Sequence, residues 1–463
     1  MNNSNIDPSN LIHRSRVLCG FLVLAGALFC FVLVQSARAV SPAPDGGYSG
    51  SNTAEGDFAL LSLTSGQYNT AIGTETLLVD TTAGQNTAVG AFALEANTTG
   101  SQNTGIGSFA LERNTEGGLN TAVGNFALFS NTIGGGNTAT GGSALVSNTE
   151  GGDNTANGYG ALFSNTTGMY NTAMGFEALS SNTTASNNTA TGFTALVFNT
   201  TGYENTADGA NALLRNTTGW YNTATGSGAL ENSTTGAGNT ADGKEALFSN
   251  TIGFSCTAVG TNALHENTIA GSNTAVGDAA LYNNTTGQVN TAIGRDALRS
   301  NTTANYNTTT GWASLYYNVT GQLNTADGAL ALLNNTGNNN IGLGQYAGGN
   351  LTNGDNNIDV ANAGVAGESN TIRIGDQAVH TAVFVAGING VDQSGGKSVF
   401  VAANGQLGTG DVSALLWPKG SILEMQPGST PPAGFTKIGT EQAKFYDLSG
   451  HPSQVTWDVY QKN

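Results

Sequence analysis

The chain contains little charge, little proline and almost no cysteine. Only 10% of its 463 residues are charged and eight are proline. Disordered chains usually carry high charge and much proline, so this composition argues against disorder. A basic cluster is also missing, because residues 52–340 include 19 acidic and five basic side chains. Nucleic-acid binding by phosphate neutralisation is therefore disfavoured, and the net charge of −17 favours a hydrated, soluble protein.

The few cysteines limit the redox chemistry of the chain. Cys19 and Cys30 lie in an N-terminal segment that we expect to be removed, so the mature chain keeps only Cys256. An internal disulfide is then impossible. Cys256 stands where a repeated unit elsewhere has Asn. We therefore expect it to be a small substitute for Asn and not a reactive thiol.

Long apolar runs are also scarce, and the one exception lies near the N-terminus. Two arginines precede an apolar run at residues 17–34, and Ala37-Arg38-Ala39 follows. This order is typical of a secretory signal peptide, so we predict that residues 1–39 are a signal peptide cleaved after Ala39. An uncleaved membrane anchor is the alternative. No other stretch is long and apolar enough to span a membrane, so no span is predicted in the mature chain.

A repeated unit fills most of the remaining chain. The unit N-T-A-x-G-x-x-A-L-x-x-N-T-T-G-x-x occurs seventeen times in succession between residues 52 and 340. We number its positions as slots 1 to 17 from the first Asn, and its copies as coils 1 to 17 from Asn52. A fixed short period predicts a solenoid of stacked coils. Seventeen residues are too few for a strand and a helix or for a helical repeat, so we predict a parallel β-solenoid.

Two turn signals punctuate each predicted coil. One is the constant Gly of slot 5, which tolerates positive φ. The other is Asn-Thr-Thr-Gly at slots 12–15, where Asn and Gly tolerate left-handed geometry. The two turns leave room for two short strands per coil, at about slots 1–5 and 7–11. The predicted fold is therefore all-β, with a thin, two-sided cross-section.

Three slots have predictable places in such a coil. The constant Leu of slot 9 is the best candidate for the core. The Asn of slot 1 is expected to stack along the axis and bond the neighbouring coils. Slot 4 is apolar in eight coils and polar in nine, including Asp208 and Asp242. Because a lone buried carboxylate is costly, slot 4 is expected to face either solvent or a subunit interface.

The motif N-T-A-V-G at residues 86–90 and 273–277 resembles the N-S-V-A-I-G motif of YadA-like trimeric autotransporter adhesin heads. The later units at residues 340–344 and 370–375, N-I-G-L-G and N-T-I-R-I-G, resemble it more closely. The resemblance implies a left-handed β-roll that is three chains wide and exposed on bacteria for attachment. The chain departs from that family in its seventeen-residue repeat, and it shows neither a heptad stalk nor a membrane-anchor signature.

The sequence divides the mature chain into three parts. Residues 40–51 are predicted to be an N-terminal cap or linker, and residues 52–375 the β-roll repeat domain. Residues 376–463 are predicted to form a small β-rich capping or oligomerisation module. In that module the motif V-F-V-A at residues 383–386 and 399–402 predicts two strands. Residues 417–435 are weakly similar to a phage tail-collar and short tail-fibre motif, and a Pro-rich turn in a cap is the alternative.

Signatures of catalysis, cofactors and metals are missing from the sequence. His265, His380 and His451 are far apart and have no Cys or carboxylate partners at metal-ligand spacing. We predict no catalytic residues, no cofactor and no metal. Calcium-binding β-rolls need a constant Asp, which this unit lacks.

The sequence therefore predicts a non-enzymatic, exported β-roll fibre at the cell surface or outside the cell. Its expected role is adhesion to a cell or matrix ligand, and its expected state is a homo-oligomer, by the resemblance a trimer. A structural appendage without a ligand is an alternative. Ice binding is a weaker one, because Thr-x-Thr occurs in only four scattered coils. An enzyme carried by residues 376–463 is the weakest.

Overall fold

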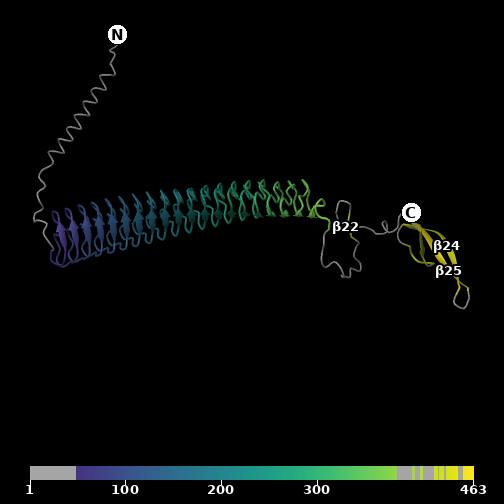
Figure 1. The fold of residues 1–463 in the computed structure, drawn as a ribbon, viewed down its shortest axis with the longest axis horizontal. Coiled ribbons are helices and arrows are strands. Elements are labelled where there is room, and N and C mark those ends of the chain that lie inside the picture. Colours follow the sequence, from purple (N-terminus) through teal and green to yellow (C-terminus); the bar gives the residue numbers. More distant parts are fainter. Residues whose placement is uncertain are drawn as a thin grey trace, which may run out of the picture. The chain divides into compact units, whose positions relative to one another are not determined.

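The computed structural model describes residues 48–382, 399–401, 407–409, 422–425, 427–431, 434–446 and 452–462. The chain divides into two units, Met1–Ile374 and Gly375–Asn463, and each is described by itself. The first unit contains one parallel sheet of twenty strands. In Figure 1 the arrows of this sheet lie together along one side of the stacked coils. Since no described residue is helical, the predicted all-β parallel solenoid is confirmed.

Each coil contributes one three-residue strand, and neighbouring strands pair in register. The spacing is seventeen residues through β17, then falls to sixteen where Thr325 pairs with Ile341. It is fourteen in the last coil, where Ile358 pairs with Ile372. The irregular units after residue 340 therefore continue the same sheet. The strands of this unit are β1 Thr53–Glu55, β2 Thr70–Ile72, β3 Thr87–Val89, β4 Thr104–Ile106, β5 Thr121–Val123, β6 Thr138–Thr140, β7 Thr155–Asn157, β8 Thr172–Met174, β9 Thr189–Thr191, β10 Thr206–Asp208, β11 Thr223–Thr225, β12 Thr240–Asp242, β13 Thr257–Val259, β14 Thr274–Val276, β15 Thr291–Ile293, β16 Thr308–Thr310, β17 Thr325–Asp327, β18 Ile341–Leu343, β19 Ile358–Val360 and β20 Ile372–Ile374.

The core is a narrow column of small and branched apolar side chains. The Leu of slot 9 is completely buried from Leu77 to Leu332, and the side chains of slots 3 and 8 are buried beside it. Slot 3 is the middle residue of each strand, and it points inward because successive strand residues face opposite sides. The prediction that slot 9 forms the core is confirmed. Alanine at slots 3 and 8 keeps the two sides of each coil close together.

The second predicted strand of each coil is wrong, because the opposite side is built from turns. The Leu of slot 9 has φ between 49° and 56° in all seventeen coils, and slot 7 also has positive φ. Residues at positive φ interrupt the extended backbone that a strand needs. This side is still bonded between coils: the amide of Leu94 donates to the carbonyl of Ala110 at 3.0 Å. Coil-to-coil hydrogen bonding therefore continues there without a second sheet.

The two glycine slots serve different purposes. Slot 5 has φ between 116° and 146° in the seventeen coils, as predicted, and only glycine takes this geometry readily. A Cβ on Gly175 would also lie 2.2 Å from the carbonyl oxygen of Gly192. The left-handed geometry predicted at Asn-Thr-Thr-Gly is wrong, since slot 17 has the positive φ there, as at Gln102. At slot 15 close packing limits the size of the side chain, because a Cβ added to Gly100 would lie 2.3 Å from the carbonyl oxygen of Gly117 in the next coil. This slot therefore favours glycine, with alanine in a few coils, as at Ala83.

Two columns of buried Asn join the coils. At slot 1, Asn86 donates its backbone amide to Oδ1 of Asn69 at 2.9 Å, and its Nδ2 donates to the carbonyl of Gly100 at 2.9 Å. At slot 12, Nδ2 of Asn114 donates to Oδ1 of Asn97 at 2.7 Å. The predicted axial bonding of the slot 1 Asn is confirmed. The slot 12 column provides a second ladder, so nearly every coil is joined to the next through buried amides.

The second unit contains two small antiparallel sheets. Strand β21, Val399–Val401, pairs with β22, Leu407–Thr409. Residues 383–386, which we predicted to be the partner of residues 399–402, lie outside the described residues. Strand β25, Pro452–Lys462, pairs with both β23, Ile422–Met425, and β24, Phe435–Tyr446. The predicted β-rich character of the C-terminal region is confirmed. The predicted signal peptide at residues 1–39 also lies outside the described residues.

Candidate functional site: the outer face and edge of the solenoid

The sheet presents one continuous outer face made by slots 2 and 4. In every strand from β1 to β20 the first and third residues are exposed or half-buried. Slot 2 is Thr in all seventeen coils, which gives a column of hydroxyl and methyl groups. Slot 4 lies beside that column, so the prediction that it is not part of a dry core is confirmed. The variation of slot 4 along the chain therefore determines how this face differs from one coil to the next.

Slot 4 forms two apolar runs, separated by a stretch that is polar except for Met174 in β8. The first run covers β2 to β5, and the side chains of Ile72 and Ile106 in it are 37% and 41% exposed. The second covers β13 to β15, where Ile293 is 42% exposed. Between them, slot 4 is Asp in β10 and β12. Contiguous exposed apolar side chains on a flat sheet are typical of protein interaction surfaces. We call the run Ile72, Val89, Ile106 and Val123 the first apolar run.

Threonine pairs on the same face are sparse. Both outward residues are Thr only in β6, β9, β11 and β16. No two of these strands are neighbours, because at least one other strand lies between each pair. A regular Thr-x-Thr array, which the ice-binding alternative needs, is therefore not formed on this face.

Exposed aromatic side chains gather at the edge of the coils formed by slots 16 and 17. Across coils 7 to 12 this edge carries six large side chains that are between 37% and 58% exposed. We call this group the edge patch: Met169, Tyr170, Tyr203, Trp220, Tyr221 and Phe254. In coils 2 to 6 the same two slots hold mainly Gly, Ser and Gln. Slot 17 also carries exposed large side chains elsewhere, at Tyr68, Leu119, Val289, Tyr306 and Leu323, so it is the aromatic residues of slot 16 that are confined to this part of the chain.

Other aromatic side chains stack in columns that run from coil to coil and stabilise the solenoid. Phe92, Phe109 and Phe126 at slot 7 stack with centroids 5.0 and 4.9 Å apart. At slot 10, the ring of His265 lies between Phe248 and Tyr282, with centroids 5.1 and 4.9 Å away. Each inner ring has aromatic neighbours on both faces. Such rings support their neighbours but offer little open ring face to a ligand.

His265, His380 and Cys256, which the sequence singled out, each have local partners in the described residues. His265 lies 3.0 Å from Glu266 through Nδ1, and Nδ1 of His380 accepts from the amide of Asp376 at 2.9 Å. His451 lies outside the described residues. Cys256 is 1% exposed, and burial raises the pKa of its thiol to about 11. Its Sγ contacts the carbonyl of Ala270 at 3.4 Å, so Cys256 replaces Asn as predicted.

Groups that could act on a ligand are few in the described ranges. Within them, no three His, Cys, Asp or Glu side chains are close enough to hold a metal ion. Their Asn-Thr-Thr sequons are also unsuited to glycosylation, because the Asn of slot 12, such as Asn97, is completely buried. The polar groups of the coil are mostly engaged in coil-to-coil bonds. The outer face, the edge patch and the two ends of the solenoid are therefore the described surfaces that can bind a partner.

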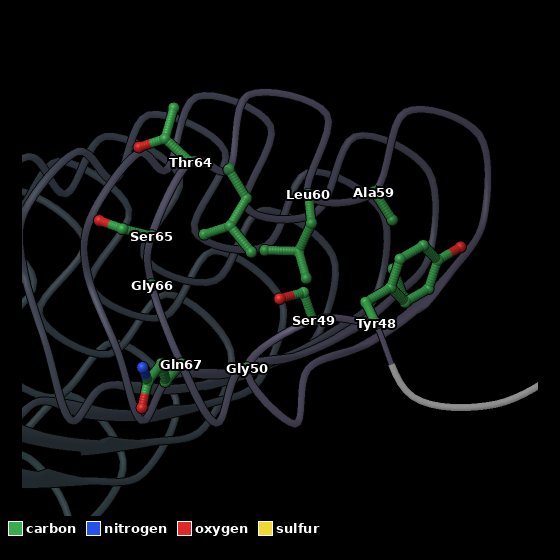
Figure 2. A pocket seen from close by; sticks show the side chains of 11 residues that line it. Tyr48, Ser49, Gly50, Ala59, Leu60, Thr64, Ser65, Gly66 and Gln67 are labelled. Atoms are coloured by element: carbon green, nitrogen blue, oxygen red, sulfur yellow. The ribbon is translucent and has the colours of Figure 1, made fainter.

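At the N-terminal end of the solenoid, the first described coil lines a pocket. Figure 2 shows this pocket, in which Tyr48, Leu60 and Gly66 are among the lining residues. Apolar atoms of the first coil's core, from Leu60 and Leu63, line it, since no coil precedes this one within the described residues. Tyr48 closes part of the end by pairing its backbone amide with the carbonyl of Asn52 at 3.0 Å. The end therefore carries only the beginning of a cap within the described residues.

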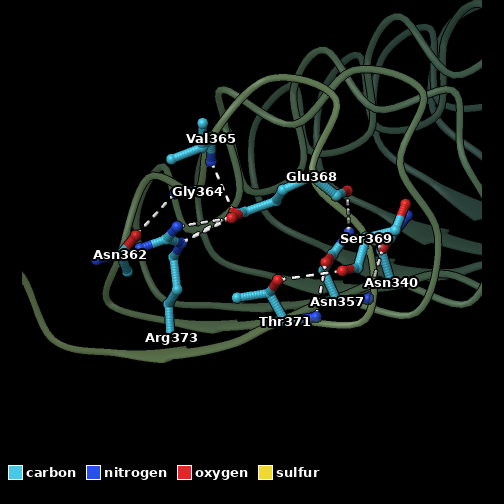
Figure 3. Close-up of polar contacts among 9 residues, drawn as sticks. All are labelled: Asn340, Asn357, Asn362, Gly364, Val365, Glu368, Ser369, Thr371 and Arg373. Carbon is cyan, nitrogen blue, oxygen red and sulfur yellow. Dashed lines mark hydrogen bonds and ion pairs between the residues drawn. The ribbon is translucent and has the colours of Figure 1, made fainter. Parts of the chain in front are cut away.

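The C-terminal end of the solenoid carries charged groups. Arg373 occupies slot 3 of β20 and forms a bidentate pair with Glu368, with Nε and Nη2 at 2.9 and 2.7 Å from Oε1 and Oε2 (Figure 3). In the preceding strand, Asp359 also occupies slot 3 and is 1% exposed, with neither carboxylate oxygen hydrogen-bonded. Burial and the charge of Glu368 raise the pKa of Asp359 to about 6. Charge therefore replaces the apolar core where the stack stops.

Comparison with protein-family models, curated proteins and solved structures found no match for this chain. Among the described residues there is also no helix long and apolar enough to cross a membrane. The similarity to YadA-like heads thus stays a prediction from the motifs at residues 86–90, 273–277, 340–344 and 370–375.

Proposed function

We propose that this protein is an exported, non-enzymatic β-solenoid that attaches to a cell or matrix surface. The observation that carries the proposal is the outer sheet face, where the slot 4 side chains of β13 to β15 form a contiguous apolar run in contact with solvent. If this face served only to keep the protein in solution, polar residues would be favoured at slot 4 throughout. The chain has such residues at Asp208 and Asp242. The resemblance to adhesin heads points in the same direction.

We further propose that copies of the chain associate laterally through the first apolar run, as a trimer by the resemblance. Each coil buries one Leu and a few Ala, so a single thin solenoid has little apolar core per residue. Covering Ile72 and Ile106 with a second copy would remove more apolar surface from water. The exposed Thr column beside them can pack closely against another sheet face.

The state of association is tested by light scattering on the purified protein and on Ile106→Asp. The substitution is compatible with the coil, since Asp208, Asp242 and Asp327 occupy the same slot naturally. We expect the wild type to have the mass of three chains and Ile106→Asp that of one. Ile133→Asp is the matched control, because Ile133 is 52% exposed at slot 14, away from this face. A wild type with the mass of one chain would contradict lateral association.

Attachment is tested by the binding of the purified protein to immobilised cells and extracellular-matrix preparations. We expect saturable binding to at least one surface, with no turnover of its components. Absence of binding across all surfaces would leave the structural appendage as the better account. A thermal-hysteresis measurement on the same sample is expected to show no activity, because the paired Thr strands are not adjacent.

A further inference from the structure

The edge patch contains three aromatic rings, from slots 16 and 17 of neighbouring coils, that contact one another. Tyr203 and Trp220, at slot 16 of neighbouring coils, stack with an angle of 5° and centroids 6.0 Å apart. Tyr221 stands at 76° to Trp220, with centroids 5.0 Å apart. Tyr203 therefore covers one face of the indole and Tyr221 supports its side. The three rings hold one another in place.

The next coil leaves the other face of Trp220 uncovered at these slots. Coil 11 has Ala237 and Gly238 there, and the amide of Gly238 donates to the carbonyl of Trp220 at 3.0 Å, so the two coils are direct neighbours. A Cβ on Gly238 would meet only Oγ and the amide nitrogen of Ser255, at 3.8 and 3.9 Å. Slot 17 of coil 11 therefore holds no bulky neighbour, and at slot 16 the coil carries only the methyl group of Ala237.

The far side of this space is bounded by Phe254, which leans away from it. Phe254 occupies slot 16 of coil 12, and its Cζ lies 2.9 Å from where a Cβ on Gly271 of coil 13 would be. The ring thus rests toward the following coil. Equivalent slots two coils apart are separated by roughly 9.6 Å. A ring-shaped ligand can therefore enter between Trp220 and Phe254 above coil 11.

Polar groups lie on the other side of the three rings. Glu204 is exposed beside Tyr221, and its charge, together with a hydrogen bond from the phenol, raises the pKa of Tyr221. A carboxylate and a phenol oxygen can accept hydrogen bonds from hydroxyl groups. The negative charge of Glu204 and of the whole chain disfavours anionic ligands.

We propose that the edge patch is a binding site for a neutral glycan, in which one pyranose ring stacks on the open face of Trp220 above Ala237 and Gly238. The faces of a pyranose carry C–H groups that pack on an aromatic ring, while its hydroxyls point outward to water and polar side chains. A quaternary ammonium group is the competing ligand, because the face of an indole attracts a cation. The rings of the patch contact one another, with centroids 5.0 to 6.0 Å apart, so Trp220 offers a cation one face and no aromatic cage.

The inference rests on the proposed attachment function, for which it names the chemical class of ligand. The test is calorimetric titration of the purified full chain with cellohexaose, chitohexaose and isomaltohexaose, with choline as the cationic probe. We expect at least one oligosaccharide to bind and Trp220→Ala to weaken that binding on the order of tenfold or more. Trp312→Ala is the matched control, since Trp312 is 47% exposed but lies at slot 6.

A second variant separates loss of the site from loss of folding. Ala237→Tyr fills the open space and removes no aromatic ring, and slot 16 already accommodates Tyr203, Trp220 and Phe254. We expect it to weaken binding as strongly as Trp220→Ala, with an unchanged thermal midpoint. The proposal is overturned if none of the three oligosaccharides binds, if Trp220→Ala binds as well as wild type, or if choline alone binds. Attachment that persists in Trp220→Ala would reject this site while leaving the proposed function intact.

Discussion

The interior and exterior slots of the solenoid have diverged to very different degrees. Slot 9 is Leu in all seventeen coils, whereas slot 16 ranges from Gly118 to Trp220. Interior side chains must match the coil above and below, so any change is felt by two neighbours. Exterior residues must match the neighbouring coils only in their backbone, so their side chains can vary. The interior thus maintains one coil shape along the chain, and the exterior can differ from region to region.

The largest effect is expected at the constant glycine of slot 5. Gly175→Ala would place a Cβ 2.2 Å from the carbonyl oxygen of Gly192, on a residue whose φ is 143°. We expect a loss of about 4 kcal/mol or more in the free energy of unfolding, measured by denaturant unfolding followed by circular dichroism. Gly142→Ala is the exterior control, because slot 6 already holds Ala210 and a Cβ on Gly142 would meet nothing nearer than Cδ2 of Tyr159, at 3.4 Å. Equal losses in the two variants would contradict the division between interior and exterior.

Truncation of a core leucine is expected to have the next largest effect. Leu162→Ala removes a completely buried side chain from the middle of the stack. We expect it to lower the free energy of unfolding by about 2–5 kcal/mol. Leu119→Ala, at a side chain that is 64% exposed, is expected to change it by less than about 0.5 kcal/mol. Denaturant unfolding of both variants measures the difference, and a small effect at Leu162 would argue against the buried Leu column.

A pH-dependent effect is expected where an acid interrupts the slot 12 Asn ladder. Asp80 is completely buried, its Oδ2 has no hydrogen-bond partner, and burial raises its pKa to about 7. Because the pKa of Asp80 is higher in the folded state than in the unfolded state, the contribution of this residue to stability is fully present below about pH 4 and is lost as the pH rises through 7. Asp80→Asn should therefore equal wild type near pH 4 and exceed it by about 1–3 kcal/mol above pH 7.

Thermal melts of the wild type and Asp80→Asn between pH 4 and pH 8 measure that difference. Asp153→Asn, at an exposed slot 17, is the matched control and should show no such growth with pH. A constant difference across the range would mean that Asp80 is not protonated on folding.

The smallest effect is a gain in stability at a gap in the same ladder. Ser233 replaces Asn in coil 11, and as a result Oδ1 of Asn216 and Oγ of Ser233 have no hydrogen-bond partner. Ser233→Asn should restore the ladder and raise the free energy of unfolding by about 1 kcal/mol. Ser300→Asn, at the half-buried slot 11, is the control and should be neutral. No gain at Ser233 would indicate that water already satisfies Asn216.

Much of the coil could be predicted from the sequence, because each interior slot repeats one physical task. The period predicted the parallel solenoid, the constant Leu predicted the core and Gly at slot 5 predicted positive φ. The second strand could not be excluded in this way. Leucine is disfavoured at positive φ, so nothing in its residue type indicates that slot 9 adopts this conformation seventeen times. Hydrogen bonds between coils offset that cost, and they become visible only in the stacked structure.

The edge patch could not be predicted from the repeat for a different reason. Slots 16 and 17 vary from coil to coil, and the repeated unit leaves them undefined. A signal is present in the sequence, since Tyr203 and Trp220 stand at slot 16, where coils 2 to 6 have only Gly or Ser. Comparing each slot with itself along the chain would have found it. Whether a ring is open or covered, however, depends on stacking, as Phe109 between two Phe rings shows.

The central claim is tested most directly by measuring the attachment of a variant that is changed only on the exterior of the solenoid. In Ile106→Asp combined with Trp220→Ala, both substitutions lie on exposed slots and leave the buried Leu and Asn columns untouched. Binding to the surfaces that hold the wild type is measured alongside the thermal midpoint. We expect this variant to lose binding. Its thermal midpoint should equal that of the wild type when both are measured in samples dilute enough to contain single chains. Undiminished binding by this variant would contradict the central claim.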